Sequence, residues 1–179
     1  LCFRARCGGG EPIWATLDSS PLTETFTGSA ATGTQLRGLS TMLSRSVRVN
    51  VEADSLNAAV IGPDVAPGDD LWHLAVRYIV TDVRQKAGQK CTAVRRVFAP
   101  EDRMDDLCES LADELSRLTV GNPANSDVTM GPVATAAQLR DTREGIEHLS
   151  EQTTLVCGGS DPIQGLDAPE GKGYFVAPT

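Results

Sequence analysis

The sequence predicts an α/β fold, in which strands and helices alternate along the chain and pack in layers. Three segments repeat apolar residues at the three-and-four spacing of an amphipathic helix. Short apolar segments lie before and between them, and one alternates at Val47, Val49 and Val51 as a half-buried strand does. Loops containing Gly or Pro separate most of these segments.

The elements before residue 70 are short. Residues 1–22 show neither helical nor strand periodicity, and the run CGGGEP lacks the spacing of a phosphate-binding loop. Residues 25–39 predict a Gly-Ser turn that leads into a short helix. Residues 46–65 predict two short strands around a polar turn, and residues 63–70 form a loop with two prolines.

Three helices and three strands are predicted after this loop. The first helix begins at Asp69 or Asp70 and ends by Gly88, and residues 92–100 follow as a strand. The second and third helices cover residues 103–118 and 135–152, and residues 153–159 and 173–179 complete the set as strands. The apolar stripes of the first two helices are Trp72, Ala75, Val76, Ile79, Val80 and Val83, then Met104, Leu107, Cys108, Leu111, Leu115 and Leu118.

Composition excludes several classes of function. The 179 residues are 40% hydrophobic, so a core is expected. Their net charge of −8 argues against nucleic acid or an anionic membrane as the main partner, because both attract clustered Lys and Arg. No apolar run approaches the roughly 18 residues of a membrane span. Arg4 and Arg6 stand where a signal peptide would be apolar, so a cytoplasmic protein is predicted.

The cysteines predict free thiols and no metal site. There are five, none in a Cys-x-x-Cys pair, and the two histidines, His73 and His148, lie far from any paired cysteines. Both histidines are expected on helix faces. Acidic residues at the start of the second long helix are expected to form a solvated face; they are Asp102, Asp105, Asp106 and Glu109.

Cys91 and Glu52 are the candidates for chemistry. Cys91 lies among cations that would favour its nucleophilic thiolate, and Ala87 and Gly88 leave space beside it. Glu52 follows the alternating strand, at a strand end where a general base is well placed. Their local sequences leave open an inert buried thiol and a solvated turn glutamate. The cations are Lys86, Lys90, Arg95 and Arg96.

Taken in order, FTGS (residues 26–29), Glu52 and AGQKC (residues 87–91) resemble the aldehyde dehydrogenase superfamily. The resemblance extends over residues 25–179 and includes GNPANSDVTMGPV at residues 121–133. It implies an aldehyde dehydrogenase-like catalytic domain over residues 53–179, an open α/β sheet with flanking helices. Residues 1–52 would be the C-terminal remnant of a Rossmann-like coenzyme domain.

The resemblance also implies a mechanism. Cys91 would attack the aldehyde and carry a thioester, with its backbone N–H in the oxyanion hole, and Glu52 would activate water as general base. Gly28 and Ser29 would hold the pyrophosphate of NADP or NAD at a helix N-terminus, and Ala53 would lie against the nicotinamide. Members of the family are homo-oligomers.

Two segments of the sequence, EADSLN and KAGQKCTA, point to a group within this family. The family usually continues Glu-Leu-Gly-Gly-Lys, whereas EADSLN with KAGQKCTA is similar to the semialdehyde dehydrogenases of coenzyme A-dependent aromatic degradation, including phenylacetate catabolism. A CoA-linked semialdehyde is therefore the expected substrate.

Some family segments have no counterpart in the chain. PLTET at residues 21–25 departs from the family's apolar strand, and the upstream Asn and Lys and the downstream Glu-x-Phe-Gly-Pro segment are absent. These 179 residues alone are expected to be inactive. A non-catalytic remnant is the alternative to an enzyme.

Overall fold

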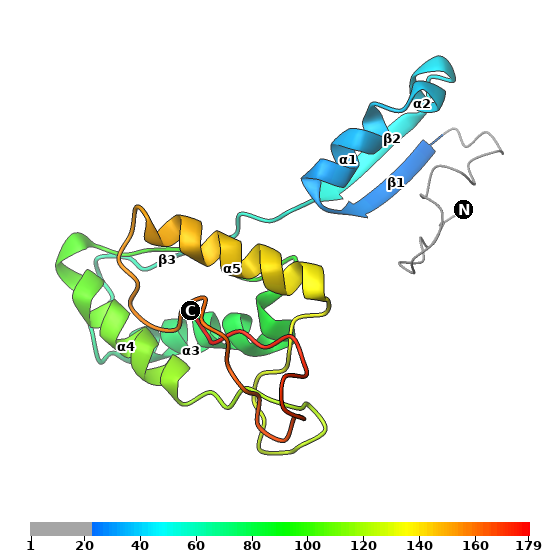
Figure 1. Cartoon of the computed structure of the whole chain (residues 1–179). Coiled ribbons are helices and arrows are strands. Elements are labelled where there is room, and N and C mark those ends of the chain that lie inside the picture. Colours follow the sequence, from blue (N-terminus) through cyan, green and yellow to red (C-terminus); the bar gives the residue numbers. More distant parts are fainter. Residues whose placement is uncertain (1–22) are drawn as a thin grey trace. The chain divides into compact units, whose positions relative to one another are not determined.

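The structure is a computed structural model that describes residues 23–179 (Figure 1). The predictions for residues 1–22, including Cys2 and Cys7, lie outside the described residues. The chain divides into two compact units, Leu1–Asp54 and Ser55–Thr179. Within residues 23–179, each unit contains one two-stranded parallel sheet.

In the first unit, β1 (Thr23–Gly28) pairs with β2 (Arg48–Ala53), and α1 (Ala30–Arg37) and α2 (Ser40–Ser44) connect them. The predicted helix is confirmed, and β1 exists although PLTET is not apolar. Its alternate residues are half-buried, and β2 supplies a hydrogen-bonding partner along its whole length, from Thr23 opposite Arg48 to Gly28 opposite Ala53. Tertiary pairing thus outweighs the weak local pattern.

In the second unit, α3 (Asp70–Arg84) and α4 (Met104–Ser116) pack together beside β3 (Ala58–Val60) and β4 (Arg96–Phe98). Most residues of the predicted stripes form this core, and Trp72 and Leu107 are each only 2% exposed. Met104, at the start of the second stripe, is 38% exposed and lies outside the core. The indole Nε1 of Trp72 donates to Ser110 Oγ at 3.2 Å, which satisfies its buried polar atom. A short 3₁₀ turn, η3 (Glu101–Arg103), leads into α4.

Two predicted elements differ from the structure in detail. Asp69 is the N-cap residue of α3, as expected, but its carboxylate accepts from Ala66 N–H rather than from the helix. The strand predicted over residues 92–100 shrinks to β4. Residues 92–95 lie outside the ladder, because the N–H groups of Ala93, Val94 and Arg95 donate to Lys90 O, Asp82 Oδ2 and Asn57 O instead.

The third helix is confirmed as α5 (Ala136–Ser150), with Thr135 Oγ1 accepting from Gln138 N–H at its start. The predictions of strands at residues 153–159 and 173–179 are wrong, because a strand needs a hydrogen-bonded neighbour and neither segment joins a ladder. Gly158 and Gly159 have φ of 75° and 129° and interrupt the first segment. Phe175 and Val176 are buried, so the apolar pattern of the second reflects packing.

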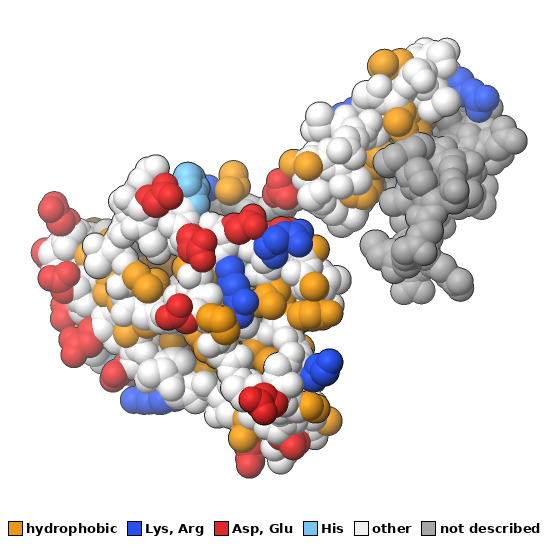
Figure 2. Space-filling model, in the orientation of Figure 1, with side chains coloured by type: hydrophobic (Ala, Val, Ile, Leu, Met, Phe, Trp, Pro, Cys, Tyr) orange, Lys and Arg blue, Asp and Glu red, His pale blue; other side chains and the backbone are white. Residues whose placement is uncertain are grey.

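Acidic side chains gather on the side of the second unit where α4 lies (Figure 2). The predicted acidic face is confirmed, since all four of its residues are exposed. His73 is exposed on α3, and His148 on α5 faces Glu151 at 3.5 Å. Over residues 23–179, no helix is long and apolar enough to cross a membrane, and no cluster of three potential metal ligands occurs.

Candidate functional site

Cys91 lies on an exposed turn between η2 (Gln85–Gly88) and β4. The approach to the turn is tightly bent: Lys86, Ala87 and Gly88 all have positive φ, between 50° and 70°. Gln89 Oε1 accepts from Ala134 N–H at 3.0 Å, which attaches the turn to the loop that precedes α5. The thiol is thus displayed to solvent on a segment that is held in place.

Asp82, on α3, ties the two ends of this turn to the helix. Its Oδ1 lies 2.7 Å from Lys90 Nζ, and its Oδ2 accepts from Val94 N–H at 3.1 Å. The hydrogen bond from Lys90 is the main reason that the pKa of Asp82 is lowered from its ordinary value, and the Val94 N–H and the charges of Lys90 and Arg95 act in the same direction against the effect of burial. The carboxylate therefore stabilises the turn as an anion.

Asn57 holds the middle of the turn. Its Nδ2 donates to the carbonyl oxygens of Cys91 at 2.7 Å and Ala93 at 3.2 Å. The backbone carbonyl oxygen of Asn57 accepts from the backbone N–H groups of Arg95 at 2.8 Å and Arg96 at 3.3 Å. Asn57, the last residue of EADSLN, therefore makes four hydrogen bonds to residues 91–96.

Three of the four flanking cations, Lys90, Arg95 and Arg96, donate to carbonyl or side-chain oxygens. Arg95 Nη2 donates to Lys90 O at 3.2 Å, and its Nε donates to Ser55 Oγ at 3.2 Å. Lys90 Nζ also donates to Gln85 Oε1 at 2.9 Å, in addition to Asp82. These two cations therefore shape the turn through hydrogen bonds, a role that their position in the sequence does not reveal.

Glu52 lies near the carboxyl end of β2 in the first unit, and its side chain is exposed. It stands opposite Thr27, and Ala53 stands opposite Gly28. Four of the predicted site residues, Glu52, Ala53, Gly28 and Ser29, thus gather at one end of the β1–β2 sheet. Cys91 belongs to the second unit.

The N-terminus of α1 has features that suit an anionic group. Ser29 is the N-cap residue, and its Oγ accepts from Thr32 N–H at 3.2 Å. Gly28, Ser29 and Ala30 are exposed, but the N–H groups of Ala30 and Thr32 already donate to Asp54 Oδ1 and Ser29 Oγ. A pyrophosphate that binds at this exposed helix end would therefore have to displace the carboxylate from the Ala30 N–H.

Asp54 is the residue at this end that sequence reasoning did not single out. It follows β2 with φ of 56°, at the third place of EADSLN, where the aldehyde dehydrogenase motif has Gly. Its N–H donates to Gly28 O at 3.3 Å, and its Oδ1 accepts from Ala30 N–H at 3.4 Å. A carboxylate of this chain therefore already stands at the N-terminus of α1.

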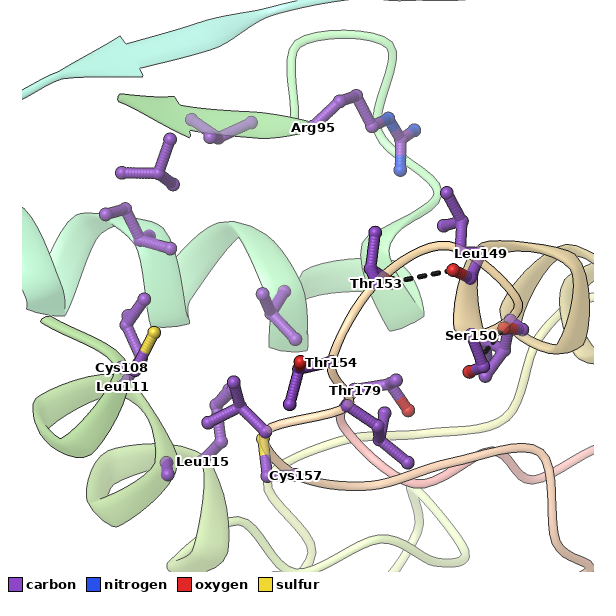
Figure 3. A pocket seen from close by; sticks show the side chains of 18 residues that line it. Arg95, Cys108, Leu111, Leu115, Leu149, Ser150, Thr153, Thr154, Cys157 and Thr179 are labelled. Atoms are coloured by element: carbon purple, nitrogen blue, oxygen red, sulfur yellow. Dashed lines mark hydrogen bonds between the residues drawn. The ribbon is translucent and has the colours of Figure 1, made fainter. Parts of the chain in front are cut away.

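Cys108 and Cys157 line a separate apolar pocket of about 380 Å³ between α3, α4, α5 and residues 153–157 (Figure 3). Burial, and then the neighbouring Cys108, raise the pKa of the Cys157 thiol. Both thiols are half-buried, whereas Cys91 is exposed. The three described cysteines are all free, but only Cys91 is presented to solvent.

Comparisons with known proteins identify the family. The model of the aldehyde dehydrogenase family matches residues 18–179. The chain is 38% identical to 3,4-dehydroadipyl-CoA semialdehyde dehydrogenase of Aromatoleum evansii, over 97% of this chain and 33% of that protein. It is 35% identical to hydroxyisobutyraldehyde dehydrogenase of Mycolicibacterium austroafricanum, over 99% of this chain and 33% of that protein.

A solved structure supports the same assignment. The crystal structure of Mycobacterium tuberculosis aldehyde dehydrogenase complexed with NAD+ is 28% identical, with a TM-score of 0.70 over 87% of this chain and 30% of that one. The chain spans about a third of the length of the curated relatives named above. It belongs to the aldehyde dehydrogenase family.

Proposed function

We propose that this chain carries the nucleophile and the general base of an NAD(P)-dependent aldehyde dehydrogenase, which oxidises an aldehyde to a carboxylic acid. The observation that carries the proposal is the presentation of Cys91: an exposed thiol on a turn that Asp82 holds at both ends. A nucleophile must be reachable by its substrate and fixed in orientation, and this arrangement supplies both.

In the proposed reaction, the Cys91 thiolate adds to the aldehyde carbon and forms a carbon–sulfur bond as the carbonyl π bond breaks. A bound nicotinamide would supply the acceptor for the hydride that leaves this carbon. The product of that step is a thioester on Cys91. Glu52 would then take a proton from the water that cleaves the thioester, which releases the acid and restores the thiol.

Residues of the first unit would hold the cofactor, NADP or NAD. Gly28 and Ser29, at the exposed N-terminus of α1, would bind its pyrophosphate through backbone N–H groups. Ala53, paired with Gly28 at the end of the sheet, would lie against the nicotinamide. We assign residues 1–52 to the C-terminal remnant of a coenzyme-binding domain and residues 53–179 to part of a catalytic domain, on the resemblance to the family.

The proposed substrate is a CoA-linked semialdehyde. The relative with 38% identity is named for such a substrate, and EADSLN and KAGQKCTA are the segments that carry the resemblance to this group. A role in aromatic catabolism, including phenylacetate degradation, a homo-oligomeric assembly and a cytoplasmic location complete the proposal.

One observation favours the second candidate, a non-catalytic remnant. The carboxylate of Asp54 at the N-terminus of α1 would repel the pyrophosphate that this end is proposed to bind. If that repulsion prevents cofactor binding, the chain would retain the fold and the exposed thiol without turnover.

Alkylation with iodoacetamide at neutral pH tests the proposed nucleophile. Peptide mass spectrometry gives a separate rate constant for each thiol, so Cys108 and Cys157 serve as internal references. We expect Cys91 to react first, because it is exposed and because burial raises the pKa of Cys157. Equal labelling of the three, or slower labelling of Cys91, would support the remnant instead.

A further inference from the structure

The two peptide groups that flank Cys91 are both held by side chains. The Lys90 carbonyl accepts from Arg95 Nη2 at 3.2 Å and also from Ala93 N–H at 3.2 Å. The Cys91 carbonyl accepts from Asn57 Nδ2 at 2.7 Å. The orientation of each of the two peptide planes next to Cys91 is therefore fixed by a side-chain hydrogen bond.

The N–H groups of the same two peptides are available. The N–H of Cys91 belongs to the peptide of the Lys90 carbonyl, and the N–H of Thr92 belongs to the peptide of the Cys91 carbonyl. Neither N–H donates to a residue in the described part of the chain, whereas those of Ala93, Val94 and Arg95 do. Because both peptides are trans, each free N–H points away from the carbonyl that the side chain binds.

Binding of a cation to a peptide carbonyl also strengthens the N–H of that peptide as a donor, since hydrogen bonds in a chain polarise one another. Ser55 holds the Arg95 guanidinium beside the Lys90 carbonyl, because Ser55 Oγ accepts from Arg95 Nε at 3.2 Å. Ser55 and Asn57 both belong to EADSLN, the segment that begins with Glu52.

We propose that Arg95, held by Ser55, and Asn57 are positioning residues for the oxyanion: they fix and polarise the peptides on either side of Cys91, so that the free Cys91 N–H receives the oxygen of the aldehyde as the thiol adds. The inference rests on the proposed role of Cys91 as nucleophile. It gives the EADSLN segment a function in orienting the Cys91 turn.

The test uses reversible addition of an aldehyde, which needs no cofactor. The Cys91 thiol adds across the carbonyl of butanal, the carbon–sulfur bond forms, and the thiol proton ends on the oxygen. Butanal then protects Cys91 from iodoacetamide, and the concentration dependence of this protection gives a dissociation constant. Alkylation without butanal, measured as a function of pH, reports the thiol itself.

Two variants separate position from charge. Arg95→Met removes both hydrogen bonds and the charge, whereas Ser55→Ala keeps the guanidinium and removes only its attachment. We expect butanal to bind about tenfold more weakly to Arg95→Met and about threefold more weakly to Ser55→Ala, because an oxyanion donor acts only when it is correctly placed. The alkylation rate without butanal should change less than about twofold in Ser55→Ala, because iodoacetamide forms no oxyanion for the Cys91 N–H to bind.

Arg84→Gln is the matched control for loss of one positive charge on the helix that leads to the Cys91 turn. Arg84 is exposed at the end of α3, and its side chain makes no hydrogen bond to a described residue. Butanal binding should be unchanged in this variant. If Arg95→Met and Ser55→Ala bind butanal as the unmodified chain does, the positioning role is refuted while the nucleophile stands. If butanal fails to protect Cys91 in the unmodified chain, the nucleophile and the positioning role are both refuted.

Discussion

Lys90 Nζ lies 2.7 Å from Asp82 Oδ1, and this ion pair joins the residue before Cys91 to α3. The two side chains are only 25% and 20% exposed, so solvent screens the pair less than the ion pairs at the surface of α4. The second oxygen of Asp82 binds Val94 N–H. The stability of the turn therefore depends on the charge of one carboxylate.

This dependence predicts the effect of pH on stability. The pKa of Asp82 is lower in the folded chain than the value of about 3.9 of an unfolded one, chiefly through the Lys90 hydrogen bond. A lowered pKa stabilises the fold above the unfolded pKa, and this stabilisation disappears as pH falls through the folded pKa. Asp82→Asn should cost about 1 kcal/mol in urea unfolding at pH 7 and progressively less below about pH 4.

Asp113→Asn is the control for this variant, because Asp113 pairs with Arg117 at 3.9 Å on an exposed face of α4. The free energy of unfolding of Asp113→Asn should differ little from that of the unmodified chain at pH 7 and at pH 3. A cost of Asp82→Asn that is the same at pH 7 and pH 3 would show that the carboxylate charge does not stabilise the turn.

Asp54 predicts a change in cofactor affinity. Asn tolerates the same left-handed backbone and can keep the contact with Ala30 N–H, but it removes the negative charge. Asp54→Asn should therefore tighten NADP binding about threefold in calorimetric titration. Glu24→Gln, on β1, removes a charge from the same unit and should leave the affinity unchanged. An unchanged affinity in Asp54→Asn would argue against a phosphate site at the start of α1.

Gly33 predicts how closely α1 must approach the sheet. This residue is buried, and a Cβ atom there would lie 2.5 Å from Val51 Cγ1. Gly33→Ala should destabilise the first unit by about 1–3 kcal/mol, despite the better helix propensity of Ala. Hydrogen exchange of peptides within residues 23–53 should then be faster.

Gly38→Ala is the comparison for this substitution, because its Cβ would meet Thr34 O at an ordinary 3.5 Å. Exchange in this variant should match that of the unmodified chain. Equal exchange in both Gly variants would mean that Val51 moves aside without cost.

Leu107 predicts the stability of the second unit. It is 2% exposed and packs in the core with Trp72 and Val76. Leu107→Ala should lower the free energy of unfolding by about 2–5 kcal/mol, through lost apolar burial and the cavity that remains. Leu71→Ala, at a site that is 61% exposed, should change it little in the same urea experiment. If Leu107→Ala changed the free energy of unfolding as little as Leu71→Ala does, Leu107 would not belong to the core of the second unit.

The elements that sequence could predict are those whose pattern is complete within one segment. The stripe from Trp72 to Val83 specified α3, and the stripe from Met104 to Leu118 specified α4. A strand depends on its neighbour, which local sequence does not contain. The short pattern before FTGS therefore concealed β1, and the apolar run at residues 173–179 suggested a strand that has no partner.

The same limit applies to the candidate site. Cys91 and Glu52 could be recognised by resemblance, but the contacts that hold Cys91 come from Asn57 and Arg95 through bonds that no short motif encodes. Asn57 lies 34 residues from Cys91 in the sequence. Asp82 offered one signal, since it is a carboxylate between Val80 and Val83, which belong to the predicted apolar stripe of α3.

The most direct measurement of the central claim, that Cys91 is the nucleophile, is carbon-13 NMR of the chain with butanal labelled at its carbonyl carbon. Addition of a thiol converts this carbon to a thiohemiacetal, whose signal is distinct from those of the free aldehyde and its hydrate. We predict a protein-bound thiohemiacetal signal in the unmodified chain and in Cys108→Ala and Cys157→Ala, and its loss in Cys91→Ser. A signal that persists in Cys91→Ser, or that is absent from the unmodified chain, would contradict the assignment.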